Sequence, residues 1–181
     1  GEVHAFEPSR EHFKKLKRNI EINNFNNIIV NECGLSNTQS RVKLFTPKNG
    51  ATGRASIFAD YKSSESFSEE EVSIIRLDDY VVKNNLEKVD LIKIDVEGAE
   101  FDVLLGSRIT LEKHRPRIVM EGDSVHLSRA CRTRQEIFDF FHELDYLIYW
   151  IDNDANLLEI NNASVSDGAY QNIYCCHQER Y

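Results

Sequence analysis

The spacing of apolar and polar residues changes repeatedly along this chain, and the changes predict strands alternating with helices. Short apolar runs at 2–6, 27–35 and 116–122 have the length and composition of β-strands. The near-continuous apolar run "KVDLIKIDV" at 88–96 is typical of a strand buried on both faces of a sheet. Residues 40–47 alternate instead, which predicts a strand with one face in solvent.

Other segments repeat their apolar residues at helical spacing. The clearest is 133–144, where Thr133 and Glu136 stand at the spacing of a capping box, in which each side chain satisfies a backbone N–H at the start of the helix. The other predicted helices are 9–24, 77–84 and 99–114, the last broken at Gly106.

Strands that alternate with helices predict a layered α/β fold with a mostly parallel sheet. A further strand is expected at 72–76, and the polar, acidic segment 48–71 is expected to be mostly loop and to help select a substrate. The last segments are expected to form an antiparallel hairpin end, with strands at 146–152, 157–160 and 169–177. At 181 residues the whole chain, 1–181, fits one domain.

Carboxylates follow several of the predicted strands directly. In open α/β sheets, ligands bind at the carboxyl ends of the strands, so these acids are expected to line one crevice. Asp95 and Glu97 would both point into it if the strand pleat continued to residue 97, and Gly98 would let the next turn approach a ligand. The acids at strand ends are Glu7, Glu32, Asp95, Glu97 and Glu121.

Charge and composition narrow the class of partner. The net charge of −8 disfavours nucleic acid or an anionic membrane as the main partner, since both attract a basic face. No apolar run approaches the roughly 20 residues of a membrane span. The four cysteines have no CxxC spacing, which indicates reduced thiols and a cytoplasmic location. Nothing in the sequence indicates an oligomeric state.

Residues 2–122 resemble the FkbM family of S-adenosylmethionine-dependent methyltransferases. The resemblance rests on four motifs in order: "VHAFEPSREHFKKLKRNIEINNFNNIIVNECGLSN", "RLDDY", "VDLIKIDVEGAEFDVLLGS" and "RPRIVMEG". It implies a Rossmann-like class I methyltransferase sandwich with S-adenosylmethionine as cofactor. It also implies transfer of a methyl group to a hydroxyl of a small-molecule or glycan acceptor, such as a sugar or secondary metabolite.

The resemblance also implies roles on the cofactor side of the crevice. Glu7, followed by Pro8, would hold the ribose hydroxyls, although a carboxylate that only stabilises the start of the next helix is an equal alternative. Glu32 and Cys33 would flank the adenine. Asp95 would face the sulfonium and its methyl group.

On the acceptor side, the resemblance places Glu97 and Glu121 in the same crevice. Relatives carry a histidine soon after the acid that matches Glu121, whereas this sequence reads "EGDSVH", with His126 five residues on. The general base is therefore open among Asp95, Glu97, Glu121, Asp123 and His126, and the alternative for His126 is a surface loop. Glu97 or Glu100 could instead only cap the helix that follows.

Members of this family begin with a strand and a glycine-rich turn that holds the methionine end of the cofactor. No Gly-x-Gly pattern occurs near Gly1, so the first strand and helix of the family fold are expected to be missing from this chain. The missing strand would leave a vacant place between the strands at 3–7 and 89–95.

Other function classes stay open at this point. A catalytically inactive fragment or nucleotide-binding module would explain the absent glycine turn, and a nicotinamide enzyme would also use Glu7 on ribose. The Asp-x-Asp at 152–154 has the form of a glycosyltransferase metal motif, but it lies in a predicted turn. We predict no metal, because no spacing demands one, although magnesium held by Asp95, Glu97 and Glu121 is the alternative.

Overall fold

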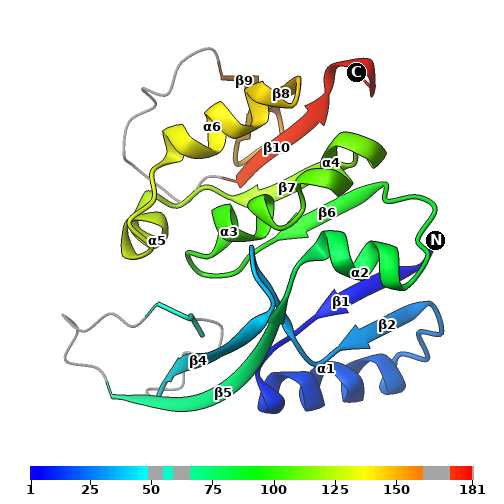
Figure 1. Cartoon of the computed structure of the whole chain (residues 1–181), viewed down its shortest axis with the longest axis vertical. Coiled ribbons are helices and arrows are strands. Elements are labelled where there is room, and N and C mark those ends of the chain that lie inside the picture. Colours follow the sequence, from blue (N-terminus) through cyan, green and yellow to red (C-terminus); the bar gives the residue numbers. More distant parts are fainter. Residues whose placement is uncertain (49–54, 59–65, 161–171, 181) are drawn as a thin grey trace.

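The chain forms three β-sheets surrounded by helices (Figure 1), seen in a computed structural model that describes residues 1–48, 55–58, 66–160 and 172–180. The strands are β1 Val3–Phe6, β2 Ile28–Asn31, β3 Gly34–Leu35, β4 Ser40–Pro47, β5 Phe67–Ile75, β6 Leu91–Ile94, β7 Arg117–Glu121, β8 Tyr146–Ile151, β9 Leu157–Glu159 and β10 Asn172–His177. The helices are α1 Arg10–Ile22, α2 Leu77–Lys83, α3 Glu100–Leu105, α4 Arg108–His114, α5 Ser124–Arg129 and α6 Arg134–Glu143, with a final 3₁₀ turn at Gln178–Arg180.

The α/β class is confirmed, but the sheets are mixed and not mostly parallel as expected, since β4 and β5 also pair antiparallel in the first half of the chain. β1 and β2 pair in parallel, as do β6 and β7. β10 then lies between β7 and β8 and runs antiparallel to both, so the expected antiparallel end is confirmed. Figure 1 shows β1, β2, β6 and β7 running toward the same side of the molecule.

The two parallel pairs belong to separate sheets. β1 pairs with β2 alone, while β6 is the first strand of a five-stranded sheet of order β6-β7-β10-β8-β9. No ladder joins β1 to β6 in the part of the chain that the structure describes. A vacant place for a further strand between them stays a prediction.

The expectation that segment 88–96 is a strand buried on both faces was wrong. The strand spans only Leu91–Ile94, and the Leu91 side chain is 59% exposed. The reason is its position: β6 stands at the edge of its sheet, with β7 as its only partner among the described residues. An apolar run reports sequence hydrophobicity but not the number of neighbouring strands.

The strand expected at 72–76 begins earlier than predicted, because β5 includes the last five residues of the segment 48–71 that was expected to be mostly loop. Residues 49–54 and 59–65 of that segment lie outside the described residues. β5 pairs antiparallel with β4 along the full length of β4, with Ser40 opposite Ile74 and Pro47 opposite Phe67. The acidic run faces basic residues across the ladder. Arg41 bonds to Glu71 at 2.8 Å and Lys43 to Glu69 at 2.8 Å. Such cross-strand pairs favour the strand state in a segment that composition alone assigns to loop.

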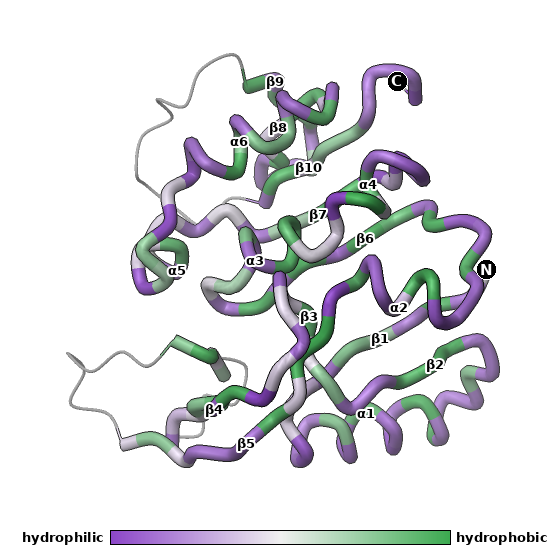
Figure 2. Tube along the Cα trace, in the orientation of Figure 1, coloured by the Kyte–Doolittle hydropathy of each residue, from purple (hydrophilic) through white to green (hydrophobic). Residues whose placement is uncertain are grey.

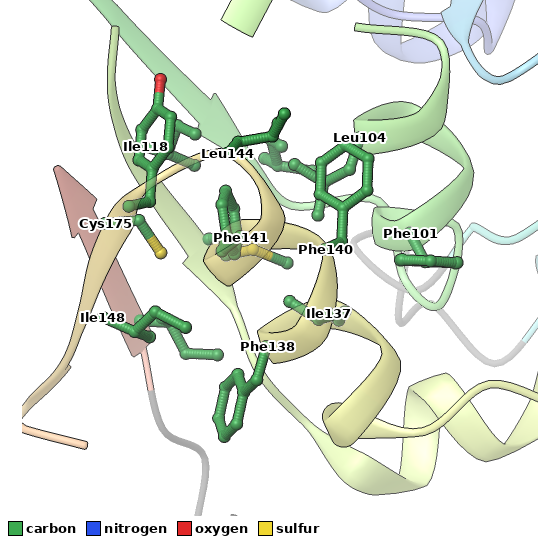
Figure 3. Close-up of a cluster of buried hydrophobic side chains, with 14 of the residues drawn as sticks. Phe101, Leu104, Ile118, Ile137, Phe138, Phe140, Phe141, Leu144, Ile148 and Cys175 are labelled. Atoms are coloured by element: carbon green, nitrogen blue, oxygen red, sulfur yellow. The ribbon is translucent and has the colours of Figure 1, made fainter. Parts of the chain in front are cut away.

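The main core lies between α6 and the five-stranded sheet. The capping box predicted for α6 is present, with the Thr133 hydroxyl accepting from Glu136 N and Glu136 bonding to Thr133 N. Phe141 is fully buried, and Figure 3 shows it between the helix and strands β7 and β10. The same cluster includes Leu104 of α3. By contrast, α1 alternates hydrophobic and hydrophilic residues (Figure 2) and buries none of them fully.

The predicted break at Gly106 separates α3 from α4 and has a packing reason. A Cβ at this position would lie 2.0 Å from the carbonyl oxygen of Ser36, so only glycine permits this approach. None of the described helices is both long and apolar enough to cross a bilayer.

Asp78, in the "RLDDY" motif, connects α2 to the start of α4. Its side chain is 4% exposed. Oδ1 accepts hydrogen bonds from the backbone N and the hydroxyl of Thr110, at 2.8 and 2.7 Å. Oδ2 accepts from Ile109 N and from Arg76, both at 3.2 Å. One buried carboxylate therefore satisfies two free N–H groups at the N-terminus of another helix.

We expect Asp78→Asn to lower the free energy of unfolding by about 2 kcal/mol, because the amide NH₂ faces donors where an oxygen now accepts. Urea unfolding followed by circular dichroism measures this. Asp79→Asn is the matched control, since the neighbouring Asp79 side chain is 55% exposed, and it should change stability by less than about 0.5 kcal/mol. Equal effects of the two variants would contradict the role given to Asp78.

Candidate active site

Three titratable side chains from three elements meet beyond the carboxyl ends of β6 and β7. Glu97 follows β6, Glu121 ends β7, and His126 lies on α5. His126 Nδ1 is 3.3 Å from an oxygen of Glu97 and 3.7 Å from an oxygen of Glu121. The three side chains are only 12–19% exposed. We call Glu97, Glu121 and His126 the acid–histidine cluster.

The alternative that His126 lies in a surface loop was wrong, because the residue is on a helix and its side chain is 12% exposed. The short helix α5 was not predicted from the sequence. Its residue Leu127 is 1% exposed in the main core, and this anchor fixes the helix next to the two carboxylates. The five-residue distance from Glu121 to His126 thus spans the end of a strand, a turn and the first turn of a helix.

An unusual backbone turn directs Glu97 into the cluster. Glu97 has a φ of 54° and Gly98 a φ of 110°, so two successive residues lie in the left-handed region. A side chain at residue 98 would place its Cβ 2.8 Å from the carbonyl oxygen of His126. Gly98 therefore allows both the turn and the close approach of α5.

Two side chains hold this turn in place. Oε1 of Glu100, which is 1% exposed, accepts from Val96 N at 3.3 Å and from Gly98 N at 3.1 Å. From the other side, the Ser56 hydroxyl donates to the carbonyl oxygen of Glu97 at 2.8 Å. Ser56 is tied in turn to Phe45 of β4 by two backbone hydrogen bonds. The β4–β5 hairpin is thus attached to the cluster, and no sequence pattern predicts this contact.

Asp95 does not join the cluster. β6 ends at Ile94, so the alternation of the pleat does not extend to residue 97 and does not bring Asp95 and Glu97 to the same side. The Asp95 side chain is 52% exposed and pairs with Lys93 at 2.6 Å. The expectation that both carboxylates leave the strand on one face was wrong, because the backbone turns between them.

The residues assigned to the cofactor side gather at the carboxyl ends of β1 and β2. Oε1 of Glu7 accepts from Ser9 N at 2.8 Å, next to the first turn of α1, which is the helix-entry role. Its second oxygen has no hydrogen bond within the described residues.

Pro8 lies near Gly34, whose added Cβ would come 3.6 Å from the proline ring. Glu32 is 49% exposed and stands 4.0 Å from Arg10. Burial raises the pKa of the Cys33 thiol, against the attraction of Lys83.

In the Asp-x-Asp at 152–154, the Asp152 side chain forms hydrogen bonds within its own turn. Oδ1 of Asp152 accepts from the backbone N of Asp154 at 2.9 Å and of Asn156 at 2.7 Å. This is the expected chemistry of an Asp-initiated turn. The glycosyltransferase interpretation therefore has no support from the geometry of this segment.

Burial shapes the electrostatics of the cluster. It raises the pKa of Glu97 above its ordinary value, and the negative charges of Glu121, Asp95 and Glu100 raise it further, against the opposing effect of His126. Burial likewise raises the pKa of Glu100, against the backbone N–H groups of Glu100 itself, Gly98 and Val96, which lower it. Ionisation of these carboxyl groups is therefore energetically unfavourable in their buried setting.

Comparison with known proteins assigns the chain to a family. The sequence profile of the methyltransferase FkbM domain matches residues 1–148. The chain belongs to the FkbM methyltransferase family. It is 33% identical over 119 residues to methyltransferase 1 of Beauveria bassiana (strain ARSEF 2860), covering 56% of this chain and 47% of that protein.

Two further relatives of this FkbM-family chain are more distant or shorter matches. It is 52% identical over 40 residues to the 2-O-methyltransferase NoeI of Sinorhizobium fredii (strain NBRC 101917 / NGR234), covering 22% of this chain and 16% of NoeI. The crystal structure of methyltransferase FkbM from Methylobacillus flagellatus KT superposes with a TM-score of 0.55 at 16% identity, covering 96% of this chain and 36% of that one. The structural likeness shows the fold. The chain spans about half the length or less of each of these relatives.

The raised pKa of Glu97 leads to a pH-dependent prediction. A carboxyl group whose pKa is higher in the folded state than in the unfolded state favours folding when protonated, and this contribution is lost as pH rises through the folded-state pKa. Glu97→Gln removes the charge without changing the size of the side chain. We expect it to raise the thermal midpoint at pH 8 in metal-free buffer, by roughly 2–4 °C for each kcal/mol gained.

The gain should shrink as pH is lowered toward 4, where Glu97 of the native protein becomes protonated. Differential scanning calorimetry of both proteins across this range measures it. Glu159→Gln, on an exposed position of β9, should leave the midpoint unchanged at every pH. A Glu97→Gln effect that is independent of pH would argue against a costly charge at Glu97.

Proposed function

We propose that this protein is an S-adenosylmethionine-dependent O-methyltransferase that acts on a hydroxyl of a sugar, glycan or secondary metabolite. The observation that carries the proposal is the acid–histidine cluster, which stands at the carboxyl ends of β6 and β7 in an FkbM domain. Ligands of α/β sheets bind at this edge. The four unpaired cysteines support a reducing compartment, such as the cytoplasm, as its location.

The residues at the ends of β1 and β2 fit a nucleoside. One oxygen of Glu7 fixes the start of α1 through Ser9 N, and this bond orients the carboxylate. The other oxygen is available to accept a hydrogen bond from a ribose hydroxyl. When bound, the sulfonium of the cofactor supplies an electrophilic methyl group. Pro8, Glu32 and Cys33 lie around the same strand ends, where they would contact the ribose and the base.

The acid–histidine cluster suits an acceptor hydroxyl. Such a group is a weak nucleophile until its proton is removed, and a carboxylate or imidazole within hydrogen-bond reach can accept that proton. The cluster provides two carboxylates and one imidazole within a few ångströms, in a largely water-excluded place. The name of NoeI, a 2-O-methyltransferase, is consistent with oxygen as the acceptor atom. Asp95, outside the cluster, would lie nearer the methyl donor.

The described residues include no glycine-rich turn for the methionine end of the cofactor. We propose that this element and its strand belong next to β1 and β6, as the family fold expects. Binding is therefore to be measured both on this chain and on the full product of its gene.

The proposed role of Glu7 in cofactor binding can be tested by titration. Isothermal titration of S-adenosylmethionine into the full gene product should show binding, and Glu7→Ala should weaken it at least tenfold, equal to about 1.4 kcal/mol. Glu21→Ala, on the outer face of α1, is the control and should bind as the native protein does. Circular dichroism checks that Glu7→Ala still folds.

Binding of NAD in place of S-adenosylmethionine would move the protein to the oxidoreductases. Absence of binding to either ligand would favour an inactive module. If the Glu7→Ala variant binds S-adenosylmethionine as tightly as the native protein does, Glu7 has no role in cofactor binding and only stabilises the start of α1.

The proposed role of His126 on the acceptor side can be tested by kinetics. His126→Ala should lower kcat for methyl transfer by about 10²–10⁴-fold, the range for loss of general acid–base assistance. The affinity for S-adenosylmethionine should stay within a few-fold of native. His142→Ala, at an exposed position of α6, is the control. A His126→Ala enzyme with native kcat would contradict the assignment of the cluster to the acceptor side.

A further inference from the structure

We propose that Glu97, Glu121 and His126 form a binding site for one divalent cation. One oxygen from each carboxylate and Nδ1 of the imidazole would be its ligands. One ligand atom from each of the three side chains lies within 4.8 Å of the others. The proposal departs from our expectation of no metal and replaces Asp95, in the magnesium alternative, by His126.

The distances are close to those between ligands of one shared ion. Ligands bonded to a cation at roughly 2.1 Å, at tetrahedral or neighbouring octahedral positions, stand roughly 3.0–3.5 Å apart. His126 Nδ1 is 3.3 Å from the Glu97 oxygen and 3.7 Å from the Glu121 oxygen. Small rotations of side chains would be enough to bring the three atoms around an ion.

Unsatisfied atoms point to the same place. Oε2 of Glu97 and Nδ1 of His126 are buried and face each other, yet neither makes a hydrogen bond within the described residues. Buried polar atoms of this kind normally have a partner. The Oε2 atom of Glu100, on a side chain that is almost wholly buried, is also without one. Glu100 interacts electrostatically with both Glu97 and Glu121, so it adds negative charge next to the cluster.

The charge balance also calls for a cation. Three carboxylates gather here, and within the described chain no lysine or arginine forms an ion pair with Glu97, Glu121 or Glu100. Only His126 can offset them, with at most one positive charge. Uncompensated carboxylates in a buried setting are unfavourable. A divalent ion would remove the imbalance.

The surroundings hold the three ligands in place before an ion binds. Glu100 and Ser56 fix the turn that carries Glu97, while buried Leu127 anchors the helix that carries His126. Oxygen ligands favour Mg²⁺ and Mn²⁺, and an imidazole shifts the preference toward Mn²⁺ and other transition metals. Three protein ligands leave positions open for an oxygen of a substrate.

A catalytic use of the ion rests on the proposed function, but its binding does not. An alcohol oxygen bound to the ion would lose its proton more readily, because the cation stabilises the alkoxide. The proton would pass to a carboxylate oxygen of the cluster that does not bind the ion, or to water. The cluster would then both bind the metal ion and accept the proton of the alcohol.

The test uses Mn²⁺ itself as the probe, in the absence of S-adenosylmethionine. The protein is freed of metal with a chelator and exchanged into chelator-free buffer. Free Mn²⁺ is then followed by electron paramagnetic resonance during titration. We expect one saturable site per chain, weakened at least tenfold in Glu121→Gln and in His126→Ala. Glu87→Gln, an exposed glutamate before β6, is the matched control and should bind as the native protein does.

Circular dichroism and thermal unfolding show whether each variant is folded, and the conservative Glu121→Gln keeps the size of the side chain. Absence of a saturable Mn²⁺ site in the folded native protein would overturn the proposal, as would native affinity in both variants. Methyl transfer measured separately with excess chelator tests the function by itself. An enzyme that stays active without metal and binds no Mn²⁺ keeps the proposed function and loses the metal site.

Discussion

The geometry of the acid–histidine cluster depends on the turn between β6 and α3. Two successive left-handed residues, Glu97 and Gly98, reverse the direction of the chain directly after a strand, and Glu97 adopts a conformation that side chains disfavour. Its cost is offset by the hydrogen bonds from Val96 N and Gly98 N to Glu100 and by the Ser56 hydroxyl. Without this turn, Glu97 would continue the line of the strand and miss both Glu121 and His126.

The rest of the fold brings supports to this turn from distant parts of the sequence. The five-stranded sheet and α6 pack around the main hydrophobic core, and Leu127 of α5 is buried in that core. Asp78 joins α2 to α4, and Gly106 lets α3 and α4 pack against the Ser36 backbone. The β4–β5 hairpin reaches the turn through Ser56. Each contact restricts the position of one side of the crevice.

Much of this fold could be predicted from local patterns. The capping box of α6, the break at Gly106 and the direction of most strands follow from spacing and turn chemistry, because these are properties of neighbouring residues. The limits of β5 and the exposure of Leu91 could not be predicted, because they depend on which strands lie alongside. Arg41 and Lys43 make the acidic run a strand, and the edge position of β6 exposes its leucine.

The candidate site was predicted in part for the same reason. Acids at the ends of parallel strands must gather at one edge, so Glu97 and Glu121 could be expected together. The prediction for Asp95 failed because the strand pleat stops at Ile94. The spacing of apolar residues does not indicate the left-handed turn that follows. Ser56 and the burial of His126 are tertiary effects. The Ser56 hydroxyl comes more than forty residues before Glu97, so no local pattern connects the two. The helix α5 has only six residues, which is too short for a recognisable helical repeat.

The central claim is that Glu7, at the end of β1, and the acid–histidine cluster, at the ends of β6 and β7, serve one methyl-transfer site. A crystal structure of the full gene product with S-adenosylhomocysteine tests it most directly. We expect the ribose hydroxyls on the free oxygen of Glu7 and the sulfur on the side of the crevice that faces Glu97, Glu121 and His126. A ligand bound away from Glu7, or with its sulfur directed away from that cluster, would contradict the account.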